Sequence, residues 1–179
     1  MKTDFYDRLA EPARLIELAR YDFADATLRA ALDEVAKRSA KLLEAPVSLV
    51  SVLGADAQQI IGAYGLSDWV ATPQGAPAEW AVCSRTVLNG EPYCVADFSE
   101  DPAHAANPFL ASTGLRSYLG VPLVAPGGVM LGAHCVVDTR RRIYTDVDLA
   151  VLSDSAEEAM EALTRACRPA PAGSRRSAG

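Results

Sequence analysis

The chain has 179 residues, of which 50% are apolar and 22% charged, and its formal net charge at pH 7 is −6. This composition is typical of one globular domain and excludes a largely disordered chain. The negative charge argues against nucleic-acid binding, which needs a clustered excess of lysine and arginine. No apolar run approaches the length of a membrane span, and the acidic N-terminus lacks the apolar core of a signal peptide. We therefore expect a cytoplasmic protein that binds neither nucleic acid nor membrane.

The N-terminal part of the chain predicts two helices. Pro12 opens an apolar pattern that indicates a first helix over Arg14–Tyr21. Asp25 is the expected N-cap of a second helix, whose apolar stripe covers Leu28–Leu42. This helix ends before Pro46, because proline cannot continue the backbone hydrogen bonding.

The periodicity then changes from that of a helix to that of strands. Val47–Leu53 is rich in β-branched residues and predicts a buried strand, and Gln58–Tyr64 pairs back onto it as a hairpin. Gly65–Pro77 contains several helix and strand breakers without any period, which predicts a loop. A short helix is expected over Glu79–Leu88, with Asn89-Gly90 as its C-terminal stop.

The next segments predict three more strands. Tyr93–Ala96 is the first, and a long connector over Asp97–Arg116 follows it, with one helical turn near Pro108–Ser112. Ser117–Val124 and Val129–Val137 are the other two, joined by a tight Ala-Pro-Gly-Gly turn.

The last periodic segment predicts a C-terminal helix. Thr145 is its expected N-cap, and its apolar stripe covers Leu149–Cys167. The composition of residues 169–179 predicts a disordered tail. The order of elements indicates an N-terminal helical segment over residues 1–24 and an α+β domain over residues 25–168. In this α/β sandwich a mostly antiparallel sheet carries the terminal helices on one face and the short helix and loops on the other.

Five sequence blocks resemble, in the same order, the GAF family of sensor domains. The resemblance extends to about Ala166. It implies an antiparallel sheet of about six strands, a ligand cavity between the sheet and the loops, and a homodimer formed through the terminal helices. The blocks are GAYGL at 62–66, WAVCSRTVLNGEPYCVADF at 80–98, DPAHAANPFL at 101–110, RSYLGVPL at 116–123 and a closing block that begins at Gly132.

The resemblance also implies where a ligand would bind. Tyr118 and Cys135 occupy positions at which related enzymes hold a ligand with an acidic side chain, and His134 would point the opposite way by strand alternation. The short helix would roof the cavity and the connector would wall it. The predicted ligand-binding residues are Trp80, Cys83, Ser84, Asp97, Phe98, Asn107, Phe109, Tyr118 and Cys135.

Simpler structural roles compete with several of these assignments. Trp80 and Phe109 are also expected as core aromatics, and Asp97 as a cap of the turn that follows it. The four cysteines are far apart and lack a CxxC pair, so reduced thiols are the expected state. Cys83, Cys94 and Cys135 are also expected as small buried residues. His134 is expected as a hydrogen-bonded core histidine and His104 as an exposed residue. No metal site is predicted.

The function we expect is that of a sensory or regulatory domain that binds an unidentified small molecule and signals through a separate protein. A dimerisation or adaptor module without a ligand is the main alternative. A thiol-dependent free methionine-R-sulfoxide reductase is disfavoured, because no cysteine lies near His104–Asn107 and the acidic positions hold Tyr118, Cys135 and Val137. The sequence motifs of cyclic-nucleotide, bilin and haem binding are also missing, and the residues name no cofactor.

Overall fold

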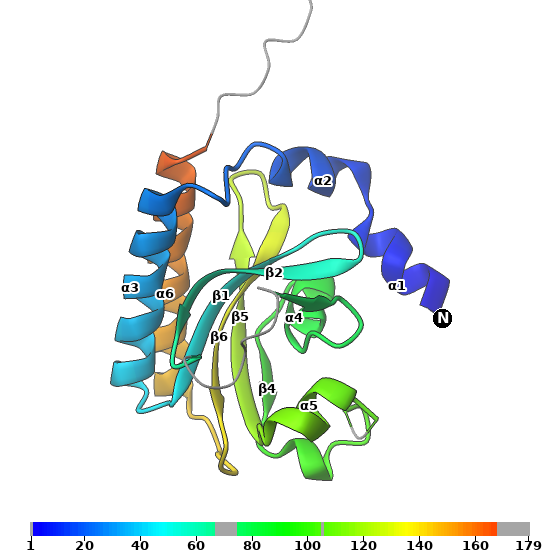
Figure 1. The fold of residues 1–179 in the computed structure, drawn as a ribbon, viewed down its shortest axis with the longest axis vertical. Helices are drawn as coiled ribbons and strands as arrows, with labels where there is room; N and C mark the ends of the chain where they lie inside the picture. Colours follow the sequence, from blue (N-terminus) through cyan, green and yellow to red (C-terminus); the bar gives the residue numbers. More distant parts are fainter. Residues whose placement is uncertain (1, 67–74, 105, 168–179) are drawn as a thin grey trace, which may run out of the picture.

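The structure, a computed structural model, describes residues 2–66, 75–104 and 106–167, and a six-stranded antiparallel sheet lies at its centre (Figure 1). The strand order is β3-β2-β1-β6-β5-β4, so the expected α+β sandwich with an antiparallel sheet is confirmed. The tail over residues 169–179 and most of the loop expected over Gly65–Pro77 lie outside the described residues. The strands are β1 (Val47–Leu53), β2 (Ala57–Tyr64), β3 (Gly75–Pro77), β4 (Tyr93–Val95), β5 (Ser117–Val124) and β6 (Met130–Asp138).

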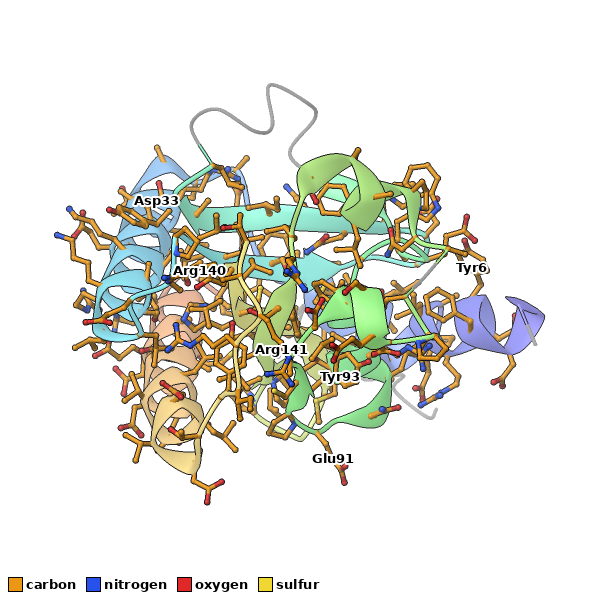
Figure 2. All side chains as sticks on the ribbon, turned by 90° about the horizontal axis from the view of Figure 1, so that it is seen from below. Tyr6, Asp33, Glu91, Tyr93, Arg140 and Arg141 are labelled. Atoms are coloured by element: carbon orange, nitrogen blue, oxygen red, sulfur yellow. The ribbon has the colours of Figure 1, made fainter. Side chains whose placement is uncertain are left out.

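Helices cover both faces of this sheet. The two long helices, α3 (Ala26–Leu42) and α6 (Asp146–Arg165), lie side by side on one face, and α4 (Cys83–Asn89) and α5 (Pro108–Thr113) lie on the other (Figures 1 and 2). Beyond the end of the sheet where β5 turns into β6 lies an N-terminal segment of two helices, α1 (Lys2–Leu9) and α2 (Pro12–Leu18). A single 3₁₀ turn, Phe98–Glu100, follows β4. Among the described residues no helix combines the length and the apolar character needed to cross a membrane.

Local sequence signals set the ends of the helices. The Asp25 carboxylate accepts a hydrogen bond from the backbone N–H of Leu28, as an N-cap does. Thr145 forms a reciprocal capping box with Asp148 at the start of α6. Gly90 ends α4 in the left-handed conformation, with φ of 68°. The expected caps at Asp25, Thr145 and Gly90 are therefore confirmed.

Four features differ from the sequence prediction. The helix expected over Arg14–Tyr21 is α2 (Pro12–Leu18), and Tyr21 instead forms a β-bridge with Cys167. Helix α1 was not expected, because its sequence KTDFYDRL has no long apolar stripe. Strand β3 falls within the segment predicted as a loop and pairs with β2 through three residues. The helix expected to begin at Glu79 begins at Cys83, because the N–H groups of Trp80 and Ala81 instead close a turn on the carbonyl of Pro77.

Strand alternation divides the core into two layers. On β6, Val136 belongs to the layer under α3 and α6, while Ala133, Cys135 and Val137 belong to the layer under α4 and the connector. Leu131 joins the first layer out of alternation, because the register between β5 and β6 shifts beside it. Both faces of the strand are buried, so its sequence MLGAHCVVD is almost continuously apolar. The face under α4 and the connector is the one on which the expected cavity would lie.

Candidate functional site

A cavity of about 70 Å³ lies between the sheet and the elements α4 and α5, on the face opposite α3 and α6. Strands β1, β2, β5 and β6 form its floor, and the residues around α4 and α5 form its walls. None of its lining residues is charged. They are Val47, Leu49, Gln58, Ile60, Leu66, Ala76, Ala81, Val82, Cys83, Phe109, Leu110, Thr113, Leu115, Tyr118, Cys135 and Val137.

Tyr118 is the largest polar side chain in this lining, and it is 2% exposed. Its ring folds back over its own strand, so that a Cβ placed on Gly120 would lie 2.1 Å from the Tyr118 hydroxyl oxygen. Only glycine leaves room for the ring at that position. The Tyr118 hydroxyl lies 3.3 Å from Thr86 Oγ1 on α4, and burial raises its pKa well above the ordinary value. Tyr118 is therefore a neutral hydrogen-bonding group in an uncharged and mostly apolar cavity.

Two buried thiols, Cys83 and Cys135, share the cavity with Tyr118. The expectation that Cys94 is also buried was wrong, because it is exposed on the edge strand β4. Burial raises the pKa of Cys83 to about 12, and it raises the pKa of Cys135 as well. The Ser51 hydroxyl donates a hydrogen bond to Cys83 Sγ over 3.7 Å. Both thiols are therefore protonated at neutral pH, whereas nucleophilic cysteines need a stabilised thiolate.

The structure brings four of the nine predicted ligand residues together, namely Cys83, Phe109, Tyr118 and Cys135. The other five lie near the cavity without lining it. Trp80 is 38% exposed, and its carbonyl accepts a hydrogen bond of 2.9 Å from Asn107 Nδ2. The side chain of Ser84 donates to the carbonyl of Ala78 over 2.5 Å. Phe98 is buried in the core layer under the connector.

Asp97 fixes the start of the connector. Its carboxylate is buried, forms an ion pair with Arg116, and accepts hydrogen bonds from the backbone N–H and the hydroxyl of Ser99 at 3.0 and 2.7 Å. The Arg116 guanidinium and these hydrogen bonds lower the Asp97 pKa to about 2. Asp97 thus has the capping role that was weighed against ligand binding.

The two histidines have different roles from each other. His134 is fully buried on the side of α3, where its Nε2 lies 2.7 Å from Ser39 Oγ and its Nδ1 lies 2.9 Å from the Leu49 carbonyl. The expectation of a hydrogen-bonded core histidine is confirmed. His104 was expected to be exposed, and this was wrong, because it is 7% exposed and its Nε2 lies 3.0 Å from the Tyr93 hydroxyl (Tyr93 is labelled in Figure 2).

Sequence analysis missed most of the apolar lining. Val47 and Leu49 on β1 could have been found from strand alternation, since their side chains share one face with Cys135 and Val137 across the β1–β6 pair. Leu115 gives no such signal, because it lies in the irregular connector. No group of three or more histidine, cysteine, aspartate or glutamate side chains in the described residues is arranged to hold a metal ion.

Comparison with known proteins identifies the fold. The family model of the GAF domain matches residues 27–163. The chain belongs to the GAF domain family. No curated protein sequence matches it.

Solved structures of other proteins share the fold of this GAF domain at low sequence identity. The GAF domain of Acinetobacter phosphoenolpyruvate-protein phosphotransferase is 14% identical over 93% of this chain and 94% of that one, with a TM-score of 0.64. Residues 122 to 287 of a methyl-accepting chemotaxis protein are 20% identical, with 77% and 89% covered and a TM-score of 0.64. The type II free methionine-R-sulfoxide reductase of Thermoplasma acidophilum is 15% identical, with 79% and 96% covered and a TM-score of 0.63.

Proposed function

We propose that this GAF domain is a sensory or regulatory module that binds a small uncharged molecule in the cavity between the sheet and α4–α5. The observation that carries the proposal is the lining of that cavity. Its residues are uncharged and mostly apolar, and Tyr118 supplies one neutral hydroxyl. Sites for small organic molecules have this character, with few polar groups that fix the orientation of the ligand.

The size of the cavity restricts the ligand. About 70 Å³ is well below the roughly 300 Å³ at which ordinary ligand sites begin. A ligand larger than a few heavy atoms must therefore displace part of the wall. Phe109 belongs to α5, a helix of six residues, and Leu115 follows that helix; both side chains are half-buried. We propose that this part of the wall moves outward when the ligand enters.

Native mass spectrometry of the protein purified from its own host tests the proposal. We expect a bound small molecule on the wild-type protein and its loss in Leu115→Trp, which fills the cavity from the connector side. Leu42→Trp is the matched control, because Leu42 is 68% exposed at the end of α3. A ligand added at a hundredfold excess over its dissociation constant should stabilise the wild-type fold by about 2.7 kcal/mol. A wild-type protein that carries no molecule, and that no neutral metabolite stabilises, would contradict ligand binding.

The small size of the cavity supports the alternative function, an adaptor module without a ligand. A homodimer formed through α3 and α6 is compatible with both the sensory and the adaptor function. Arg38 and Lys41 are exposed on α3, and Asp154, Glu157 and Glu161 are exposed on α6. We propose that α3 of one protomer packs on α6 of a second copy. Light scattering should then show a dimer whose dissociation increases from about 0.05 M to about 0.5 M salt, because exposed ion pairs are screened. An unchanged mass in Lys41→Glu would oppose this arrangement.

A reductase function is not proposed. Two of the similar structures are free methionine-R-sulfoxide reductases, from Thermoplasma acidophilum and Neisseria meningitidis. In this chain, however, burial keeps the thiols of Cys83 and Cys135 protonated, and thiol chemistry proceeds through the thiolate. We propose a cytoplasmic location, in which these thiols stay reduced.

A further inference from the structure

A second and larger cavity lies between the N-terminal segment, α4 and the turn that joins β5 to β6. Its volume is about 340 Å³, which falls within the range of ordinary small-molecule sites. It lies apart from the sheet-face cavity of the proposed function, and the two share no lining residue. Around Gly128 in the turn there is open space, since no atom lies within 4 Å of a Cβ placed there.

A buried arginine forms part of the wall of this second cavity. Arg14 is 6% exposed, and its guanidinium donates to the carbonyls of Met130 at 2.8 Å, Leu9 at 2.9 Å, Leu131 at 3.1 Å and Leu53. These bonds use four of the five guanidinium N–H groups, and the fifth, on Nη1, has no acceptor among the described residues. Burial lowers the pKa of Arg14, but a guanidinium in a protein is not deprotonated, so the group remains a cation.

The charge of Arg14 has no ion-pair partner within the described part of the chain. Carbonyl dipoles satisfy its hydrogen bonds, but no described carboxylate oxygen lies within 4 Å of it, so the positive charge is not neutralised by a direct contact. Glu11 attracts the Arg14 charge from beyond contact distance, but the effect of burial is larger, and an anion in the adjacent cavity would offset more of the cost. The site therefore favours a negatively charged occupant.

Two exposed charges at the same cavity adjust this preference. Arg8 lines it, and one of its N–H groups donates to the Leu88 carbonyl, which leaves others for a ligand. Glu11 also lines it, and the Glu11 side chain makes no capping bond to the start of α2. Two arginines and one glutamate give a net charge of +1. The remaining wall includes Val87 and Val129, which are apolar.

We infer that this second cavity binds a small organic carboxylate, with the carboxylate toward Arg8 and Arg14 and an apolar body against Val87 and Val129. A ring of benzoate size suits this arrangement. Such a ligand would hold the N-terminal segment to α4 and to the β5–β6 turn at once, because all three contribute to the lining.

The test uses three probes of nearly equal shape and different charge: benzoate, benzamide and benzamidinium, titrated by NMR at constant ionic strength. We expect benzoate to bind about tenfold more tightly than benzamide, because hydrogen bonds between charged groups are stronger than those to a neutral group. Benzamidinium carries a positive charge like the arginines and should not bind. Arg8→Gln should weaken benzoate about tenfold and leave benzamide unchanged. Arg165→Gln is the matched control, because Arg165 is exposed at the end of α6.

Two further substitutions separate binding from folding. Glu11→Gln should tighten benzoate binding severalfold, a gain that a damaged fold cannot produce. Ala13→Trp should block the cavity, whereas Ala19→Trp, also exposed but outside the lining, should bind normally. Leu115→Trp should bind benzoate as the wild type does, because Leu115 lines only the sheet-face cavity. A failure of the proposed function at the sheet-face cavity can therefore be distinguished from a failure of binding at the second cavity. Equal affinity for benzoate and benzamide, unchanged binding in Ala13→Trp, or no benzoate binding at tens of millimolar would each overturn the inference.

Discussion

The buried His134 makes the stability of this domain depend on pH in a defined direction. Burial lowers its pKa from 6.5 to about 4, despite the opposing effect of the Leu49 carbonyl. That carbonyl can only accept, so Nδ1 carries the proton in the neutral ring, and Nε2 accepts from Ser39. The unfolded chain binds a proton at His134 below pH 6.5, whereas the folded chain does so only near pH 4. Folding stability must therefore fall as the pH decreases through this window.

The size of the effect follows from the two pKa values. The difference between 6.5 and about 4 corresponds to about 3 kcal/mol in total, of which about 2 kcal/mol is lost by pH 5. The Asp97 carboxylate, with its pKa lowered from 3.8 to about 2, contributes only at still lower pH. The change between pH 8 and pH 5 thus isolates the histidines from this carboxylate.

Urea unfolding of the wild type and of His134→Gln at pH 8 and pH 5 measures the effect. The loss between the two pH values should be about 2 kcal/mol smaller in His134→Gln than in the wild type. His104→Gln is the control, because it keeps His134 and should retain that part of the loss. Burial also lowers the His104 pKa, so His104→Gln removes the separate contribution of His104 to the loss of stability at low pH, which has the same sign as that of His134. An identical pH dependence in the wild type and in His134→Gln would refute the reasoning, as would an NMR titration of His134 near pH 6.5.

Four more substitutions test the packing and the hydrogen bonds of the fold. In Gly62→Ala the new Cβ would lie 2.6 Å from Leu32 Cβ and 2.7 Å from the Leu32 carbonyl carbon, so α3 must move away from the sheet. We expect the free energy of unfolding, measured in urea, to fall by about 1–3 kcal/mol. Gly54→Ala, where the nearest contact is an ordinary 3.4 Å, should be nearly neutral, and equal losses at both glycines would be inconsistent with the steric argument. Arg14→Lys cannot replace the four carbonyl contacts, so limited proteolysis should cut the N-terminal segment faster; an unchanged rate would mean that other contacts hold it. Thr145→Ala removes the cap of α6 and should cost about 1 kcal/mol by thermal unfolding, whereas a change near zero would show that Thr145 is not needed to hold the first turn.

The parts of the fold that sequence analysis predicted are those in which a local pattern repeats. The strands Val47–Leu53 and Ser117–Val124 have the predicted bounds, because β-branched residues and breakers mark both ends. Helix α3 has the predicted N-cap for a similar reason. By contrast, β3 is three residues long, and α1 is only two turns long with few apolar residues, so neither leaves a pattern long enough for a sequence window to detect.

The candidate site was predictable in part, on two strands (Tyr118 and Cys135), on α4 (Cys83) and on α5 (Phe109). The resemblance to the family placed Tyr118 and Cys135 on the cavity side of the sheet, and alternation then placed His134 on the other side, where the structure has them. The path of the connector decides the rest, and it depends on long-range contacts such as Asp97 with Arg116 and Tyr93 with His104. The near contact of Tyr118 with Gly120 likewise arises from the direction of one side chain, which no sequence motif specifies.

The pairing of β1 with β6 has a consequence for how the chain acquires its structure. Val47 lies opposite Val137, so the middle of the sheet joins segments that are far apart in sequence. Closing so long a loop costs entropy before any contact compensates for it, which makes folding slow compared with that of a helical bundle. On the ribosome, β1 and β2 can form a hairpin early, but the sheet remains in two halves until β6 has been synthesised.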